Sequence, residues 1–250
     1  MNIGAQFYTI RDFCKDTDSF AESLKKVADI GYKYVQISGT CAYNPEWLKE
    51  NLDKNGLKCV ITHIPADDII GKTDEVINNH NIFNCKYIGL GYHNFDTEDK
   101  QENYNNFVNT YKTAAQKIKD SGKYFMYHNH HFELMKIGGE ILLEKMCRDF
   151  APEEMGITLD TYWIQKAGGD PASWLEKLSG RVPCIHLKDM TYEGNMAVIG
   201  EGNINFDRVF EKAEKSGTKY MLVEQDDCYG ENPFDCLKRS YEFLKSKGFE

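Results

Sequence analysis

The feature that most constrains the fold of this chain is a regular alternation of short apolar runs with longer amphipathic ones. We expect strands at eight runs, namely Ile3–Tyr8, Tyr34–Ile37, Cys59–Ile64, Tyr87–Leu90, Tyr124–Tyr127, Ile157–Leu159, Cys184–Leu187 and Tyr220–Val223. We expect helices after them, at Ser19–Ile30, Pro45–Asn55, Asp74–Asn79, Glu102–Asp120, Gly139–Phe150, Pro171–Leu178, Phe206–Ser216 and Pro233–Lys247. The helical period is clearest between Tyr104 and Ile118, where aromatic and aliphatic residues recur on one face.

The strand runs are almost continuously apolar, which is typical of parallel strands covered on both faces. Eight strand–helix units in strict alternation predict an α/β fold, a closed (β/α)8 barrel. A doubly wound open sheet is the alternative, but it usually has fewer strands and a glycine-rich first turn, which Gly4-Ala5-Gln6-Phe7 is not. No linker rich in Pro, Gly or Ser divides the 250 residues, so we expect one domain over residues 1–250.

A weak internal repeat marks four of the junctions between a helix and the next strand. It occurs at Gly31–Val35, Asn84–Ile88, Gly122–Phe125 and Gly217–Met221. In each copy Gly or Asn caps the helix, a Lys lies in the turn, and an aromatic residue begins the strand. The repeat supports the number of units counted above.

The charge balance is acidic, with 30 Lys and Arg against 39 Asp and Glu and a formal net charge of −9. This argues against a nucleic-acid partner, because phosphate binding needs clustered cations. No run approaches the ~20 apolar residues of a membrane span, and Met1–Gly4 lead directly into a strand without a signal-peptide core. The 8 Cys form no CxxC pair, and we expect them to be free thiols. Free thiols are typical of a cytoplasmic protein, which we therefore expect. The sequence does not determine the oligomeric state, so a homo-oligomer remains an alternative.

Catalytic groups of such barrels lie at the carboxyl ends of the strands. Six of the seven His fall at or just beyond predicted strand ends, and only His80 does not. The side chains expected at this end are Gln6, Tyr8, Gln36, His63, His93, His128, His130, His131, Glu133, Asp160, Trp163, His186, Lys188, Glu224, Asp226 and Asp227.

Asp160, His186 and Glu224 each follow an apolar strand directly, where an ionised group is costly unless it is paired or binds a metal. A lone carboxylate at such a place is more often a helix cap, and we expect Asp170 and Asn205 to be helix caps without a chemical role. The joint occurrence on neighbouring strands favours a metal site. Carboxylates with an imidazole suit Mn²⁺ best, with Mg²⁺, Co²⁺, Fe²⁺ or Zn²⁺ as alternatives.

Five segments carry a family resemblance over essentially the whole chain: YHNHHFE (127–133), GITLDTYW (156–163), CIHLKDM (184–190), GEGNINF (200–206) and LVEQDD (222–227). They resemble the sugar phosphate isomerase/epimerase family, the xylose isomerase-like TIM barrels. The resemblance implies a metal held by Asp160, His186 and Glu224. It does not support the endonuclease branch, whose larger set of His ligands is not reproduced.

The fifth strand departs from the family pattern, since many members have Glu-Asn-His where this chain has His128-Asn129-His130. The missing carboxylate ligand is either replaced by Glu133, which we favour, or His128 itself coordinates the metal. Glu133 is favoured because two carboxylates beside the metal provide acid and base groups.

The family chemistry implies a divalent-metal-dependent isomerase or epimerase of carbohydrate metabolism that acts on a ketose or keto-sugar through a metal-stabilised enediolate. Glu133 and Glu224 would be its acid and base. His63, His93, His128, His130 and Lys188 would contact substrate oxygens, and Trp163 would contact the sugar ring. The alternative is a metal-dependent lyase or dehydratase acting on a keto-inositol or 3-keto-glycoside. A non-catalytic sugar-binding barrel is disfavoured, because the metal ligands are intact.

Overall fold

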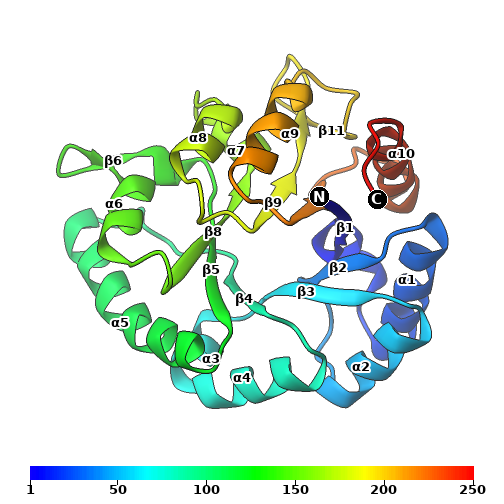
Figure 1. Ribbon diagram of the computed structural model, residues 1–250, viewed down its shortest axis with the longest axis horizontal. Coiled ribbons are helices and arrows are strands. Elements are labelled where there is room, and N and C mark those ends of the chain that lie inside the picture. Colours follow the sequence, from blue (N-terminus) through cyan, green and yellow to red (C-terminus); the bar gives the residue numbers. More distant parts are fainter.

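Eight parallel strands close into a barrel in the computed structural model, which describes residues 1–250 (Figure 1). The strands are β1 (Asn2–Gln6), β2 (Tyr34–Ile37), β3 (Lys58–His63), β4 (Tyr87–Leu90), β5 (Tyr124–His128), β8 (Met155–Asp160), β9 (Cys184–Leu187) and β12 (Tyr220–Val223). Each pairs in parallel with its neighbour along the chain, and β1 closes the barrel by pairing with β12. The predicted closed barrel is confirmed.

Helices cover the outside of the barrel. They are α1 (Thr17–Ile30), α2 (Pro45–Lys54), α4 (Thr73–Ile82), α5 (Lys100–Asp120), α6 (Leu142–Asp149), α8 (Pro171–Lys177), α9 (Phe206–Lys215) and α10 (Pro233–Ser246). Asp170 and Asn205 cap α8 and α9 through their side-chain oxygens, as the sequence predicts. None of these helices has both the length and the hydrophobicity needed to cross a membrane.

Several short elements between strands and helices were not predicted. They are the 3₁₀ helices η1 (Phe7–Phe13) and η2 (Phe132–Leu134), the helices α3 (Ala66–Gly71) and α7 (Thr161–Lys166), and the hairpins β6–β7 (Lys136–Ile137, Glu140–Ile141) and β10–β11 (Asp189–Met190, Met196–Ala197). They are too short to show a hydrophobic period. Two predicted boundaries shift because of them, since β1 ends at Gln6 rather than at Tyr8, and α6 begins after Gly139.

Both shifts have local causes. The Gln6 side chain accepts a hydrogen bond from the Tyr8 backbone N–H at 2.8 Å and so turns the chain into η1. Gly138 and Gly139 have φ values of 64° and 88°, and form the tight turn of the β6–β7 hairpin. Only glycine adopts such angles readily, so the helix starts beyond them.

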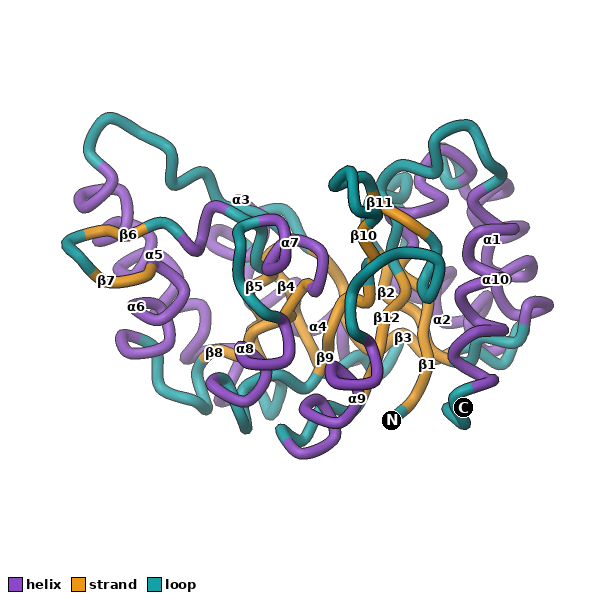
Figure 2. The backbone as a smooth tube through the Cα atoms, turned by 90° about the horizontal axis from the view of Figure 1, so that it is seen from above, coloured by secondary structure: helices purple, strands orange, loops and turns teal.

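The apolar core has two parts. The larger fills the space between the strands and the helices, and a smaller cluster inside the barrel consists of Val60, Ile61, Tyr87, Met126, Cys184 and Leu222. Because the interior is filled, the two ends of the barrel are separate surfaces. In Figure 2 the two termini lie at one end, and the β10–β11 hairpin lies at the other, toward which the strands run. All eight cysteines are free, as expected.

Candidate metal centre

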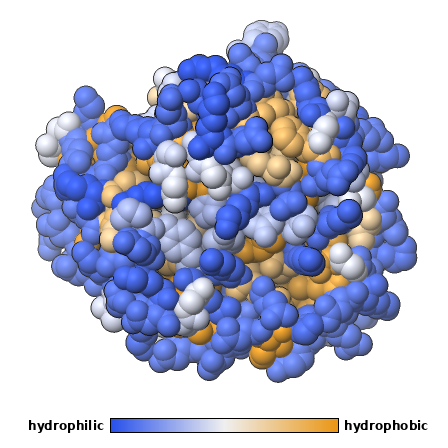
Figure 3. Space-filling view, in the orientation of Figure 1, coloured by the Kyte–Doolittle hydropathy of each residue, from blue (hydrophilic) through white to orange (hydrophobic).

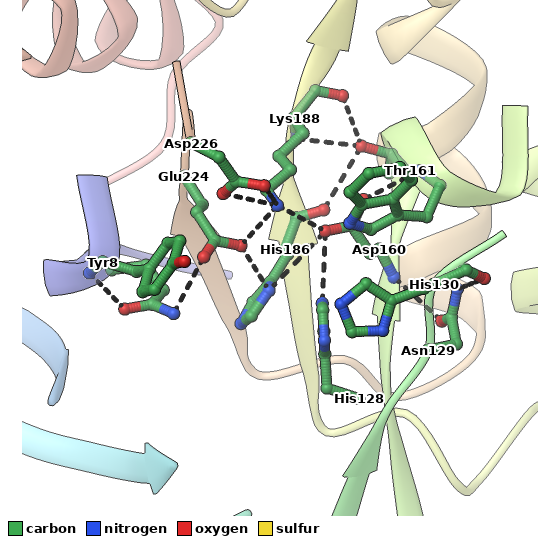
Figure 4. A network of polar contacts seen from close by, with 12 residues as sticks. Tyr8, His128, Asn129, His130, Asp160, Thr161, His186, Lys188, Glu224 and Asp226 are labelled. Carbon is green, nitrogen blue, oxygen red and sulfur yellow. Dashed lines mark hydrogen bonds and ion pairs between the residues drawn. The ribbon is translucent and has the colours of Figure 1, made fainter. Parts of the chain in front are cut away.

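Four buried side chains bring their ligand atoms together at the carboxyl end of the barrel (Figure 4). His128 and Asp160 are the last residues of β5 and β8, His186 is the last residue but one of β9, and Glu224 follows β12 directly. One nitrogen or oxygen of each lies within 4.8 Å of those of the other three. The strands are neighbours in the barrel, so their ends converge on one point.

The two imidazoles are oriented from outside this point. His128 Nδ1–H donates to the Gly91 carbonyl oxygen at 3.1 Å, and His186 Nε2–H donates to Gln36 Oε1 at 2.7 Å. Each ring therefore turns its other nitrogen toward the carboxylates. Hydrogen bonds of this kind to the outer nitrogen are typical of metal-binding His.

The two carboxylates are held in the same manner. Asp160 Oδ1 accepts the Trp163 backbone N–H at 3.0 Å and caps α7, while Glu224 Oε1 accepts from Gln6 Nε2 at 2.9 Å. The second oxygen of each carboxylate faces the centre. Asp160 is thus both a helix cap and a candidate ligand, although the sequence presents these as alternatives.

The inner atoms fit a shared cation. His186 Nδ1 and Glu224 Oε2 lie 2.8 Å apart and are buried, yet neither forms a hydrogen bond. Asp160 Oδ2 lies 3.3 Å from His128 Nε2 and 3.7 Å from His186 Nδ1. Two imidazole nitrogens and two carboxylate oxygens form a mixed donor set that suits Mn²⁺, Fe²⁺, Co²⁺ or Zn²⁺.

Lys188 is buried beside these ligands. Its Nζ lies 3.3 Å from Asp160 Oδ2, 3.0 Å from Glu224 Oε2 and 2.8 Å from Asp226 Oδ1. Although burial lowers the pKa of Lys188, Asp160 and Glu224 outweigh it and raise the pKa above the usual range. Lys188 is therefore an ammonium group that shares two oxygens with the candidate cation.

Asp189, the residue after Lys188, does not pair with that ammonium group. Its carboxylate accepts backbone N–H groups from Gly200, Gly202 and Ile204 at 2.9, 2.9 and 3.1 Å. The segment that follows β11 is thereby fixed over the end of β9. We assign Asp189 a positioning role for this segment.

The neighbouring ionisable groups have strongly shifted pKa values. Burial lowers the pKa of His128, and nearby His186 lowers it further. For His186, burial acts in the same direction, but Glu224 and Asp160 outweigh it and raise the pKa to about 9. Burial and Glu224 together raise the pKa of Asp226 to about 6. These opposed shifts show that the charges of the site are strongly coupled.

A cavity of about 560 Å³ reaches the candidate metal centre, where His128 and Glu224 line it. Among the residues that line it are Gln6, Tyr8, His63, Tyr92, His128, His130, Trp163, Lys188, Glu224 and Asp226. Five of these carry a buried polar atom without a hydrogen-bond partner, namely His63 Nε2, His130 Nδ1, Trp163 Nε1, Glu224 Oε2 and Asp226 Oδ1, and only the last two face Lys188. A ligand rich in hydroxyl groups is suited to supply the missing partners.

The structure does not bring Glu133 to the other candidate ligands. Its Oε1 accepts from the Tyr127 hydroxyl at 2.5 Å and its Oε2 from the His130 backbone N–H at 2.7 Å, so the carboxylate lies beneath the loop after β5. Burial raises the pKa of Glu133 to about 7. The cluster that could hold a metal includes His128 and not Glu133, which differs from the alternative that we favoured.

His93 also differs from its expected place, because it does not line the cavity. Its ring faces Asn103 Oδ1 at 3.1 Å and packs against Phe95 and Phe107, with ring centroids 4.5 and 5.0 Å away. His63, His128, His130, Trp163 and Lys188 do line the cavity.

Two residues that orient candidate ligands were not predicted from the sequence to do so. Gln6, on the strand next to β12, donates to Glu224, and Gln36 on β2 accepts from His186. A signal for both was present, because a glutamine at the end of an apolar strand must find a buried partner.

Comparison with known proteins identifies relatives of this fold. A family model described as xylose isomerase-like TIM barrel matches residues 24–247. An inosose dehydratase of Bacillus cereus is 28% identical over 150 residues, which are 52% of this chain and 49% of that protein, so the chain spans about half the length of the curated relatives it matches.

Solved structures extend the comparison to the whole chain. A sugar phosphate isomerase/epimerase from Parabacteroides distasonis superposes with a TM-score of 0.82 at 22% identity, covering 98% of this chain and 97% of that one. A D-allulose 3-epimerase from Methylomonas sp., solved in complex with D-allulose, superposes with a TM-score of 0.75 at 15% identity, covering 98% of this chain and 96% of that one. At these identities the likeness establishes the fold.

Proposed function

Because the chain belongs to the xylose isomerase-like TIM barrel family, we propose that it is a divalent-metal-dependent enzyme that removes a proton next to the carbonyl group of a keto-polyol. The observation that carries the proposal is the convergence of four buried ligand atoms, each on a side chain whose other polar atom is tied to the protein. We propose His128, Asp160, His186 and Glu224 as the ligands and Mn²⁺ as the preferred ion.

A divalent cation held there supplies positive charge that polarises the carbonyl group and makes the neighbouring proton more acidic. Glu224 is the proposed base, because Lys188 and His186 overcome its burial and hold the pKa of its carboxyl below the usual range, so that it remains ionised. Lys188 carries N–H donors at the same wall of the cavity and is placed to bind a substrate hydroxyl group.

The reaction we favour is a dehydration. Epimerisation by two carboxylates needs one on each face of the substrate, and Glu133, the expected second carboxylate, is bound to Tyr127 and to the His130 backbone away from the cavity. Elimination needs one base and a donor to the departing hydroxyl, which Glu224 and Lys188 provide. The inosose dehydratase relative supports the same choice.

Epimerisation is the second candidate function. His63 and His130 line the cavity, and burial lowers the pKa values of both, so neutral imidazoles are present to exchange a proton with a substrate. In this reaction one of these rings replaces the missing carboxylate.

The substrate we propose carries no phosphate. The only Lys or Arg that lines the cavity is Lys188, and it already lies within 3.3 Å of three carboxylates. A phosphate dianion would therefore meet acidic groups without a free cation. Keto-inositols and 3-keto-glycosides fit these properties, and Trp163 and Tyr8 offer aromatic surfaces for a ring.

The test is a panel of ketoses, keto-inositols and 3-keto-glucosides followed by NMR in D₂O, with Mn²⁺-loaded and chelator-treated enzyme. Dehydration produces a conjugated enone and loss of a hydroxyl group, whereas epimerisation incorporates deuterium and keeps all hydroxyl groups. Proton exchange that persists at full rate in the chelated enzyme contradicts the proposed role of the metal.

A further inference from the structure

The amino-terminal end of the barrel, opposite the candidate metal centre, carries a ring of five lysines. Lys33, Lys58, Lys86, Lys123 and Lys219 lie at or immediately before the first residues of β2, β3, β4, β5 and β12. Four of them are the lysines of the repeated helix-to-strand junctions. Parallel strands begin at the same end of a barrel, so the repeat places these charges around one opening.

These lysines lack carboxylate partners. The ion pairs of the chain all use other cations, although the net charge of −9 leaves acidic groups in excess. Only Lys123 is tied to the protein, through a hydrogen bond to the Cys85 carbonyl at 2.9 Å. Like charges around one opening repel each other, so an anion from outside would be favoured there.

Tyrosines form the floor of this opening. Tyr34, Tyr87, Tyr124 and Tyr220 are the first residues of β2, β4, β5 and β12. The ring of Tyr220 lies 5.3 Å from that of Tyr34 and 6.3 Å from that of Tyr87, between centroids. Figure 3 views this end, where strongly hydrophilic residues stand around a paler centre.

The floor offers hydrogen-bond donors as well as aromatic surface. The Tyr124 hydroxyl donates to the Pro152 carbonyl, but the hydroxyl groups of Tyr34, Tyr87 and Tyr220 make no hydrogen bond within the chain. Free hydroxyl groups below free ammonium groups form a suitable lining for phosphate oxygens.

Two cavities lie at this end and share Lys86, Tyr87 and Lys219. One, of about 340 Å³, also includes Lys58 and Tyr34. The other, of about 390 Å³, also includes Lys119, Lys123 and Tyr124.

The two cavities also contain carboxylates, which limit the net positive charge. Asp53 in the first is bound to Lys49 at 2.5 Å, and Glu153 lies in the second. Lysines outnumber carboxylates in both cavities, so each retains an excess of positive charge.

We propose that the amino-terminal end of the barrel binds a small ligand with two or more phosphate groups. The shared residues Lys86 and Lys219 lie between the two cavities and would contact phosphates in both. The site is separate from the candidate metal centre, because buried residues that include Ile61, Met126 and Leu222 fill the barrel between them.

Calorimetric titration of the metal-free full chain with tripolyphosphate tests the proposal without chelation of a metal by the probe. We expect saturable binding at one site near 0.15 M salt, and weaker binding of pyrophosphate and then of inorganic phosphate. Lys86→Gln and Lys219→Gln should each weaken tripolyphosphate binding about tenfold, since each removes one charge from both cavities.

Lys136→Gln is the matched control, because Lys136 is an exposed lysine without an ion pair on the β6–β7 hairpin, away from this opening. It should leave the affinity unchanged, and so should Glu224→Gln at the metal centre. The proposal is overturned by absence of saturable binding, by equal losses in Lys86→Gln and Lys136→Gln, or by loss of binding in Glu224→Gln. Tighter binding of a long RNA through the same lysines would also overturn it.

Discussion

His186 Nδ1 and Glu224 Oε2 lie 2.8 Å apart without a hydrogen bond, while His186 Nε2 is fixed by Gln36 at 2.7 Å on the other side of the ring. The imidazole is thus held in one orientation by a residue of β2, which lies three strands away from β9 in the barrel. The site consequently depends on residues that would not themselves touch a metal.

Gln36→Ala should weaken Mn²⁺ binding about 10- to 100-fold, the usual cost of removing the hydrogen bond that orients a metal-binding His. Calorimetry with Mn²⁺ measures this effect. Gln116→Ala, on the outer face of α5, is the control and should bind as the wild type does. Unchanged affinity in Gln36→Ala would show that the ring is oriented without this bond.

His128→Gln and Glu133→Gln distinguish the two residues that the sequence left open as the fourth ligand. We expect His128→Gln to lower the metal content of the purified protein strongly, because it removes one of the four converging donors. Glu133→Gln should retain one full equivalent of metal, since the Glu133 carboxylate is bound to Tyr127 and to the His130 backbone. Elemental analysis of both variants gives the answer, and the reverse pattern would reinstate Glu133.

Lys188→Met should tighten Mn²⁺ binding by about tenfold and abolish turnover. The ammonium group lies 3.3 Å from Asp160 Oδ2 and 3.0 Å from Glu224 Oε2, so its removal frees both oxygens for the cation. Titration followed by the electron paramagnetic resonance of free Mn²⁺ measures the affinity. Lys166→Met, a lysine near Trp163, serves as the control. Weaker binding in Lys188→Met would mean that Lys188 supports the metal rather than competes with it.

His80 should make the folded protein less stable in acid. It is buried between Thr62 Oγ1 and the Val76 carbonyl, and burial lowers its pKa from 6.5 to about 4. Below pH 6.5, His80 of the unfolded chain therefore binds a proton, whereas His80 of the folded chain stays neutral. The free energy of unfolding consequently falls by up to about 3 kcal/mol as the pH is lowered to about 4.

Urea unfolding of chelator-treated protein at pH 7, 5.5 and 4.5 measures this loss. His80→Gln should lose less stability between pH 7 and 4.5 than the wild type, whatever its stability at pH 7. His131→Gln, at an exposed His, should follow the wild type. If the free energy of unfolding falls equally with pH in the wild type and in His80→Gln, the prediction is contradicted.

Much of the candidate site was predictable because two regularities act together. Apolar runs locate the strands, and a parallel barrel brings the residues that follow them to one end. Asp160 and Glu224 directly follow such runs and His186 is the last residue but one of another, so their shared end is predicted and their convergence is observed. Gln36 lies near the end of a strand in the same way, but its contact with His186 crosses the barrel and depends on the register of three strand pairs.

The amino-acid sequence by itself determined the barrel, the end at which its polar side chains gather, and three of the four residues of the candidate cluster, because these follow from hydrophobic period and strand order. Only the tertiary structure brings His128, and not Glu133, to this cluster. The Tyr127 hydroxyl and the His130 backbone N–H hold the Glu133 carboxylate beneath its loop, while the Gly91 carbonyl turns His128 toward Asp160. Such a choice depends on where hydrogen-bonding partners lie after folding, which no spacing along the chain encodes.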